Sequence, residues 1–186
     1  MKYKALVFDF FGVVCSEISP FWFKEYLPED SKELKHQYLH PADRGDVSQE
    51  ELFNELSELS GQPALKIERD WESRACFNTE VIDLIKDLRG EYKIGLLSNS
   101  MAPLFHTLAE QIHVSTLFDE IAVSSEIGHA KPELEAYEFI LNKLGILPEE
   151  AIMIDDTQVN IDAAVKVGMA GHLFTSVQEL KTSLRK

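Results

Sequence analysis

Side chains that could carry out phosphoryl-group chemistry recur at the ends of short apolar runs in this 186-residue sequence. They comprise three carboxylates, one hydroxyl, one amide and one ammonium: Asp9, Ser98, Asn99, Lys131, Asp155 and Asp156. The first, second and fourth apolar runs lead into these side chains, and Lys131 precedes a proline that opens a helical pattern. Because the carboxyl ends of parallel strands meet at one edge of an open sheet, we expect these side chains to converge there.

The charges of this set indicate its chemistry. A carboxylate such as Asp9 can act as a covalent nucleophile, but its attack on a phosphate dianion brings two negative charges together. A divalent cation relieves that repulsion, and Mg²⁺ is commonly held by one or two carboxylates with water and phosphate oxygens. Asp9 with the pair Asp155–Asp156 could supply such a site. Ser98, Lys131 and the backbone N–H groups after Asp9, beginning with that of Phe10, would hold the phosphoryl oxygens.

Apolar runs and helical patterns alternate along the chain and must position these residues. The runs expected to form buried strands are Ala5–Phe8, Lys93–Leu97, Ile121–Val123, Ile152–Ile154 and Gly171–Phe174. The helical patterns between them are Glu80–Arg89, Leu134–Leu144 and Asp162–Val167. Strands that alternate with helices imply parallel pairing through crossover connections. The sequence therefore predicts an α/β fold, a doubly wound parallel sheet covered by helices on both faces.

One interval interrupts this alternation. Residues 16–75 contain no convincing buried strand but several amphipathic stretches, of which Ser48–Leu59 is the clearest. There Ser48 and Glu51 have the spacing of a capping box, and Gly61 followed by Pro63 closes the helix. We therefore expect an all-helical insertion at residues 16–75, beside an α/β domain made of residues 1–15 and 76–186.

The composition restricts the partners of the protein. Eighteen basic against 32 acidic residues give a net charge of −14, and a field of that sign repels nucleic-acid backbones and anionic lipid headgroups. No stretch approaches the ~20 apolar residues of a membrane span, and the amino-terminal apolar run is too short for a secretory signal. Two cysteines imply no disulfide framework and fit a reducing compartment. We expect a cytoplasmic protein, monomeric or homodimeric, with no nucleic-acid or membrane partner.

Four segments of the sequence resemble the motifs of a known family. VFDFFGVV, LLSNS, SSEIGHAKPE and IMIDDTQVNIDAAVKVGM are similar to motifs one to four of the haloacid dehalogenase superfamily of hydrolases. The match spans nearly the whole chain, and its last two segments resemble the branch with a small helical cap. That branch includes sugar-phosphate phosphatases and the amino-terminal phosphatase domain of soluble epoxide hydrolases. The resemblance implies that the insertion at 16–75 is such a cap on a Rossmann-like core.

The resemblance also implies a role for each matching side chain. Asp9 would be the nucleophile, Ser98 and Asn99 would donate hydrogen bonds to the phosphoryl group, and Lys131 would stabilise its charge. The implied substrate is a small phosphorylated metabolite, which would be hydrolysed through an aspartyl-phosphate.

The implied cofactor is Mg²⁺. Asp156 would be a direct metal ligand, and Asp155 would be its auxiliary partner. The backbone carbonyl of Phe11, two residues after the nucleophile, would supply another ligand. Because that ligand would belong to the main chain, the metal site can survive the phenylalanine side chain at this position.

Phe11 is also where the sequence departs from the family's phosphatases, which carry a second aspartate there. That aspartate protonates the leaving oxygen and then activates water, and such assistance is typically worth about 10²–10⁴-fold. Three hypotheses remain: a Mg²⁺-dependent phosphohydrolase that is slow or uses another proton source, a hydrolase of carbon–halogen or carbon–phosphorus bonds, and a non-catalytic binding or regulatory protein. Carbon–phosphorus relatives use a cap lysine, for which Lys24, Lys32 and Lys35 are available. The paired carboxylates of the fourth segment favour the first hypothesis over metal-free dehalogenation, and Phe11 favours the third.

Charged residues in the expected cap have simpler explanations. His36 and His40 lie four residues apart, and we expect them on a hydrated polar face rather than at a metal. Arg44 is expected to pair with Asp43 or Asp46 rather than to reach over the active site.

Overall fold

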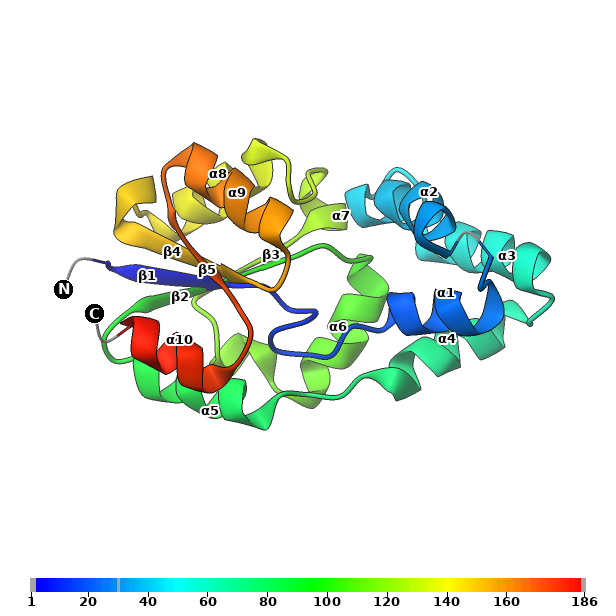
Figure 1. Cartoon of the computed structure of the whole chain (residues 1–186), viewed down its shortest axis with the longest axis horizontal. Helices are drawn as coiled ribbons and strands as arrows, with labels where there is room; N and C mark the ends of the chain where they lie inside the picture. Colours follow the sequence, from blue (N-terminus) through cyan, green and yellow to red (C-terminus); the bar gives the residue numbers. More distant parts are fainter. Residues whose placement is uncertain (1–2, 30, 185–186) are drawn as a thin grey trace.

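Five parallel strands form the centre of the molecule. The computed structural model describes residues 3–29 and 31–184. Its strands are β1 (Ala5–Phe8), β2 (Lys93–Ser98), β3 (Glu120–Val123), β4 (Ala151–Asp155) and β5 (Ala170–Leu173). They are paired in the order β3-β2-β1-β4-β5, with the first strand of the chain in the middle (Figure 1). The predicted α/β class and parallel sheet are confirmed.

Helices cover both faces of this sheet. Helices α8 (Leu134–Leu144) and α9 (Gln158–Val167) pack on one face. The other face is covered by α5 (Thr79–Leu88), α6 (Ala102–Gln111) and α10 (Val177–Leu184). Successive residues of β1 alternate between the two layers: Leu6 and Phe8 belong to one hydrophobic cluster, and Ala5 and Val7 belong to the other. All four are fully buried, as expected of the central strand in a doubly covered sheet.

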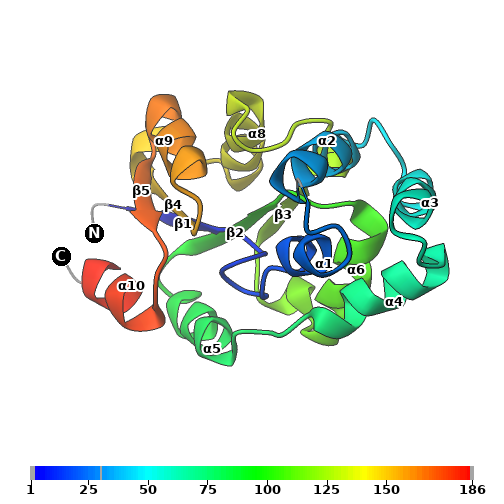
Figure 2. The same cartoon turned by 45° about the vertical axis from the view of Figure 1, so that its right-hand side comes forward.

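Four helices occupy the interval between β1 and α5. They are α1 (Ser19–Tyr26), α2 (Ser31–Arg44), α3 (Gln49–Ser60) and α4 (Ala64–Arg74), and they lie beyond the carboxyl ends of the strands (Figures 1 and 2). The capping box predicted for α3 is present, because Glu51 N–H donates to the Ser48 hydroxyl and the Glu51 carboxylate accepts from Ser48 N–H. We call residues 16–75 the helical insertion. Its assignment as a domain separate from residues 1–15 and 76–186 stays a prediction.

Several element boundaries differ from the predicted ones. Ser98 and Asp155 are the last residues of β2 and β4 rather than the residues after them. Helix α9 begins at Gln158, four residues before the predicted start, and α6 and α10 were not predicted. The remaining elements are the short helix α7 (Ser124–Ile127) and two 3₁₀ turns, η1 (Val114–Thr116) and η2 (Pro148–Glu150). Among the described residues, no helix has the length and apolar character that crossing a membrane requires.

Candidate active site

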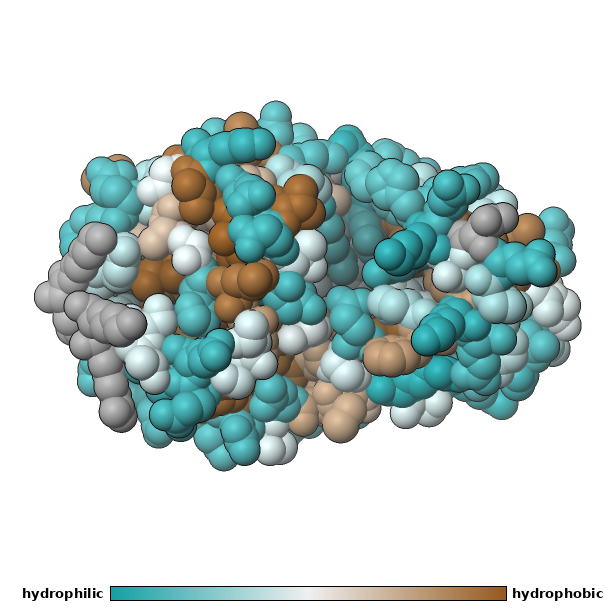
Figure 3. All heavy atoms as spheres, in the orientation of Figure 1, coloured by the Kyte–Doolittle hydropathy of each residue, from teal (hydrophilic) through white to brown (hydrophobic). Residues whose placement is uncertain are grey.

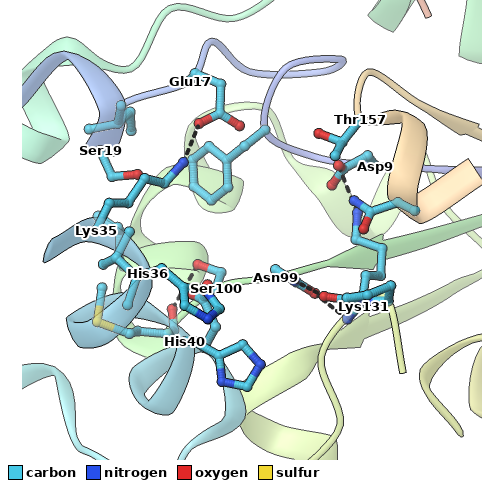
Figure 4. A pocket seen from close by; sticks show the side chains of 18 of the residues that line it. Asp9, Glu17, Ser19, Lys35, His36, His40, Asn99, Ser100, Lys131 and Thr157 are labelled. Atoms are coloured by element: carbon cyan, nitrogen blue, oxygen red, sulfur yellow. Dashed lines mark hydrogen bonds and ion pairs between the residues drawn. The ribbon is translucent and has the colours of Figure 1, made fainter. Parts of the chain in front are cut away.

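A cavity of about 540 Å³ lies between the helical insertion and the carboxyl ends of the strands. The molecular surface is hollowed in this region (Figure 3), and Figure 4 shows the cavity from close by. The wall on the sheet side includes Asp9, Asn99 and Lys131. These residues come from three different strand ends, so the predicted convergence at one sheet edge is present.

Lys131 lies between two of the predicted carboxylates. Its Nζ is 2.7 Å from Oδ2 of Asp9 and 2.7 Å from Oδ2 of Asp155, and its side chain is only 1% exposed. Burial lowers the pKa of Lys131, but Asp9 and Asp155 outweigh this effect and hold its pKa above the usual range. A buried ammonium is stable only where opposite charges replace its hydration, and the two carboxylates do this.

Asp9 is buried directly after β1, and contacts hold both of its carboxylate oxygens. Oδ1 accepts a hydrogen bond of 2.6 Å from the Phe10 N–H, and Oδ2 faces Lys131. Burial and the charge of Asp155 raise the pKa of Asp9 well above its usual value, against the opposing effect of Lys131. The carboxylate is therefore poorly solvated and oriented in advance, as a nucleophile requires.

Asp155 is held by more partners than Asp9. It accepts hydrogen bonds from the Thr157 N–H at 2.8 Å and from the Asn160 amide at 3.1 Å, in addition to the ammonium of Lys131. Burial alone would raise the pKa of Asp155, but Lys131 lowers it below the usual value. Asn160 had no role assigned from the sequence. The available signal was its position four residues after the paired aspartates of the fourth segment.

Asp156 completes a cluster of three carboxylates. Oxygen atoms of Asp9, Asp155 and Asp156 all lie within 4.8 Å of one another. Burial and the charge of Asp155 raise the pKa of Asp156. Gly12 passes so close that a Cβ atom there would come within 2.1 Å of an Asp156 oxygen, and its φ of +80° also suits glycine. Three converging carboxylate oxygens are the donors that Mg²⁺ prefers, and a cation would relieve their repulsion, so these residues fit a Mg²⁺ ion.

Ser98 and Asn99 follow different patterns. Ser98 is fully buried at the end of β2, and its hydroxyl has no hydrogen-bond partner among the described residues. Ser98 is not among the residues that line the cavity, so its donation of a hydrogen bond to a phosphoryl group stays a prediction. The Asn99 amide instead pairs with the backbone of Lys131 through two hydrogen bonds of 2.8 Å. Asn99 therefore positions the Lys131 loop, and its donation to a phosphoryl group stays a prediction.

Aromatic side chains follow the nucleophile candidate. Phe10 is fully buried, with its ring 5.0 Å from that of Phe105 and 5.0 Å from that of Phe11. Phe11 lines the cavity. Phe11 therefore presents a hydrocarbon ring at the position where the family's phosphatases carry a second aspartate. The role of the Phe11 backbone carbonyl as a metal ligand stays a prediction.

The facing wall contains Lys35, one of the lysines considered for carbon–phosphorus cleavage, and two carboxyls that the sequence did not single out as site residues. Glu17, Lys35 and Asp43 all line the cavity, and Lys35 Nζ is 3.8 Å from Glu17 Oε2. Burial raises the pKa of Asp43 to about 7, and burial also raises the pKa of Glu17. The sequence carries no signal for these carboxyls, because their burial depends on how α2 packs against the strand ends.

Two other predictions for α2 need refinement. His36 is exposed, in keeping with the expected hydrated face, and both His36 and His40 line the cavity (Figure 4). Arg44 pairs with Asp46 at 3.2 Å, as expected, but it also pairs with Glu133. The second ion pair connects the helical insertion to the segment that contains Lys131.

Comparisons with known proteins identify similar sequences. A sequence model of the haloacid dehalogenase-like hydrolases matches residues 3–168. The chain is 28% identical over 180 residues to the sesquiterpene phosphatase AstK of Aspergillus oryzae, covering 94% of this chain and 92% of that protein. It is 25% identical over 185 residues to the D-ribitol-5-phosphate phosphatase of Bacteroides thetaiotaomicron, covering 89% of this chain and 88% of the relative.

A solved structure has the same fold. It is a HAD family enzyme from Bacteroides thetaiotaomicron in complex with magnesium and inorganic phosphate. The two structures superpose with a TM-score of 0.81, at 24% sequence identity, over 96% of this chain and 98% of the other. At this identity the similarity establishes the fold, and the chemistry of this chain must be argued from its own residues.

Proposed function

This chain belongs to the haloacid dehalogenase-like hydrolases, and on that basis we propose that it is a Mg²⁺-dependent phosphohydrolase with Asp9 as its nucleophile. One observation carries the proposal: Lys131 lies between Asp9 and Asp155, Asp156 completes a cluster of carboxylates, and both Asp9 and Lys131 line a cavity. The phosphatases among its relatives, and the solved structure with magnesium and phosphate, support it.

The first step is attack of Asp9 on phosphorus. The hydrogen bond from the Phe10 N–H and the contact with Lys131 orient the carboxylate of Asp9. In this proposal Lys131 and the hydroxyl of Ser98, which has no hydrogen-bond partner among the described residues, hold phosphoryl oxygens as negative charge develops on them. The bond from phosphorus to the leaving oxygen breaks, and an aspartyl-phosphate remains on Asp9.

The second step returns the enzyme to its starting state. Water attacks the phosphoryl group on Asp9, which releases inorganic phosphate and the free carboxylate. Phe11 gives this water no basic assistance, so we expect the second step to be slow in comparison with enzymes that carry a carboxylate there. Lys131 remains charged throughout because Asp155 stays beside it.

The residues that would hold Mg²⁺ are Asp9, Asp156 and the backbone carbonyl of Phe11, with Asp155 as an auxiliary partner. The ion would supply positive charge that offsets the repulsion between the Asp9 carboxylate and an anionic substrate. Asp155 is already engaged by Lys131 and Asn160, which fits an auxiliary role better than direct ligation.

The biological setting is part of the same proposal. We propose a small phosphorylated metabolite as the substrate and residues 16–75 as a cap domain that closes over it. A cytoplasmic location fits the two free cysteines, Cys15 and Cys76. Either a monomer or a homodimer is compatible with an active site built from one chain.

Carbon–halogen cleavage and a non-catalytic role are less well supported by this geometry. Cleavage of a carbon–halogen bond requires the Asp9 nucleophile but no metal. Without a cation, nothing would offset the repulsion among the three clustered carboxylates. A non-catalytic protein would have no need for the buried and oriented Asp9–Lys131 pair, which is costly to desolvate.

The test is phosphate release from p-nitrophenyl phosphate with Mg²⁺ and with a chelator. We expect metal-dependent turnover by the native chain and none by Asp9→Asn. Asp87→Asn, which removes the same charge from an exposed position on α5, serves as the matched control and should retain activity. Turnover that survives both Asp9→Asn and chelation would contradict the proposal.

A further inference from the structure

The nucleophile loop itself offers no acid to a leaving group. After Asp9 the loop reads Phe-Phe-Gly-Val-Val-Cys, and Phe11 is the member that lines the cavity. The ammonium of Lys131 is occupied by two carboxylates. Without general-acid help, phosphoryl transfer is fast only to a leaving group that is stable as an anion. An alkoxide is a poor anion, whereas a phosphate, whose second pKa is about 6, leaves without being protonated.

The wall opposite Asp9 is suited to receive an anionic leaving group. Lys35, His36 and His40 of α2 are all directed at the cavity that Asp9 and Lys131 line (Figure 4). The two imidazole rings are 5.4 Å apart, so both can contact one group. The ion pair of Lys35 with Glu17, at 3.8 Å, is longer than a hydrogen bond and leaves the ammonium protons available to a ligand.

Two carboxyls on the same wall oppose this effect only weakly. Burial raises the pKa of Asp43 to about 7, with Lys35 lowering it and Glu17 raising it. Burial raises the pKa of Glu17 too, against the effect of Lys35. An incoming anion raises both pKa values further, which favours the neutral forms of these two carboxyls.

We propose that the preferred substrates are phosphoanhydrides, such as organic diphosphates, with the inner phosphate held by Lys35, His36 and His40. The inference rests on the proposed function and names its substrate class. Asp9 forms a bond to the terminal phosphorus, and the bond from that phosphorus to the bridging oxygen breaks. The bridging oxygen keeps the electron pair and departs as part of an organic monophosphate. Water then cleaves the phosphoryl group from Asp9 and gives inorganic phosphate.

Three substrates separate the effect of a good leaving group from the effect of a second phosphate. Hexyl diphosphate has an anionic leaving group, p-nitrophenyl phosphate has a good leaving group without a second phosphate, and hexyl phosphate has a poor leaving group. With Mg²⁺ we expect kcat/KM to fall in that order, with a difference of about 10²-fold or more between the two hexyl compounds. The comparison uses kcat/KM because this constant reports the first step, in which the leaving group departs.

Substitutions test the α2 contacts to the inner phosphate and the lack of an acid at position 11 separately. Lys35→Met, and the double variant His36→Asn with His40→Asn, should each lower kcat/KM for hexyl diphosphate about tenfold more than for p-nitrophenyl phosphate, because each removes charge-assisted contacts to the inner phosphate. Lys24→Met, an equal loss of charge on α1 outside the cavity, should leave the ratio unchanged. Phe11→Asp should raise hydrolysis of hexyl phosphate about 10²-fold relative to hexyl diphosphate.

Several results would overturn the inference. Equal kcat/KM for hexyl diphosphate and hexyl phosphate would overturn the inference. It would also be overturned if Lys35→Met and the double histidine variant lost kcat/KM equally on all three substrates. Selective loss of hexyl phosphate hydrolysis in Glu17→Gln or in Asp43→Asn would identify that carboxyl as the acid for the leaving group and would also overturn the inference. Phosphate release that survives Asp9→Asn contradicts the proposed function itself, whereas Asp9-dependent release without the diphosphate preference contradicts only this inference.

Discussion

Gly12 shows how closely single residues determine the carboxylate cluster. Its φ of +80° and its contact with Asp156 leave no room for a side chain, since a Cβ atom would lie 2.1 Å from a carboxylate oxygen. Asp156 would have to move away from Asp9 and Asp155 to accept even a methyl group. The nucleophile loop therefore depends on glycine for two independent reasons, the backbone conformation and the close approach of Asp156.

We expect Gly12→Ala to lower kcat/KM by about 10²-fold, because displacements near 1 Å in an active site have effects of that size. Gly61→Ala is the matched control. Gly61 also has a positive φ, +68°, but a Cβ atom there meets no atom within 4 Å. Both variants should lose stability in thermal unfolding, and only Gly12→Ala should lose activity. Full activity of Gly12→Ala would show that Asp156 is not required where it lies.

Asp43 makes stability depend on pH in a defined direction. Its pKa in the folded protein is raised by burial to about 7 from an ordinary value of 3.8, and the opposing effect of Lys35 is smaller. The folded state therefore binds a proton that the unfolded state has released, and this stabilisation is lost as the pH rises through about 7. Glu17 and Lys131 are the other charged groups that act on Asp43.

Asp43→Asn removes that titration. The melting temperature of the variant minus that of the native protein should increase from about pH 4 to about pH 8, as measured by thermal unfolding across the range. A difference that stays constant with pH would show that Asp43 has an ordinary pKa and is solvated.

At the scale of elements, two contacts join the helical insertion to the site. Arg44 at the end of α2 pairs with Glu133, two residues after Lys131. Gln49 at the start of α3 accepts a hydrogen bond of 2.8 Å from the Leu104 N–H in the first turn of α6. These contacts hold α2, with its cavity-facing side chains, over the strand ends.

Arg44→Ala should weaken substrate binding more than the chemical step. Its side chain contacts neither Asp9 nor Lys131 in the structure but fixes α2 relative to them, and partly exposed ion pairs of this kind are worth about 1 kcal/mol or less. We expect KM to rise about three- to fivefold with little change in kcat. Lys66→Ala, which breaks the exposed Lys66–Asp70 pair within α4, is the control. An equal fall in kcat would place Arg44 in the chemical step.

The sequence predicted the elements whose boundaries depend on local chemistry. Leu134–Leu144 was predicted without error, because apolar periodicity coincides there with a glycine C-cap at Gly145. The start of α3 followed from the capping box. Strands β2 and β4 continue one residue further than predicted, because Ser98 and Asp155 pair in the sheet although they are polar.

In the site, the proximity of some residues could be predicted from the sequence, whereas the orientation of others could not. The proximity of Asp9, Lys131 and Asp155 could be predicted, because strand ends of a parallel sheet converge. The orientation of His36 and His40 could not, because it depends on which side of α2 packs against its neighbours. Leu39 and Ala42 are the buried residues of that helix, and their packing directs the histidines toward the cavity.

At the scale of the whole molecule, a net charge of −14 and a cluster of carboxylates favour the binding of a cation to the folded protein. Mg²⁺ that binds only the folded state stabilises it by mass action. A concentration of about 100 times the dissociation constant contributes about 2.7 kcal/mol, which corresponds to roughly 5–10 °C in melting temperature for a chain of this size.

We expect Mg²⁺ to raise the melting temperature by that amount and a chelator to remove the increase. Asp156→Asn should lose most of the shift, and the exposed Asp87→Asn should keep it. An equal shift in both variants would indicate that Mg²⁺ acts through the general charge of the protein and not through the carboxylate cluster.

The proposed mechanism requires that a phosphoryl group becomes bonded to Asp9. The direct measurement is mass spectrometry of peptides after acid quenching of the protein during turnover of hexyl diphosphate or p-nitrophenyl phosphate with Mg²⁺. We predict one added phosphoryl group on the peptide that contains Asp9, accumulating because Phe11 leaves the second step without assistance, and no such group in Asp9→Asn. Rapid turnover with an unmodified Asp9 peptide, or a phosphoryl group at another residue, would contradict the account.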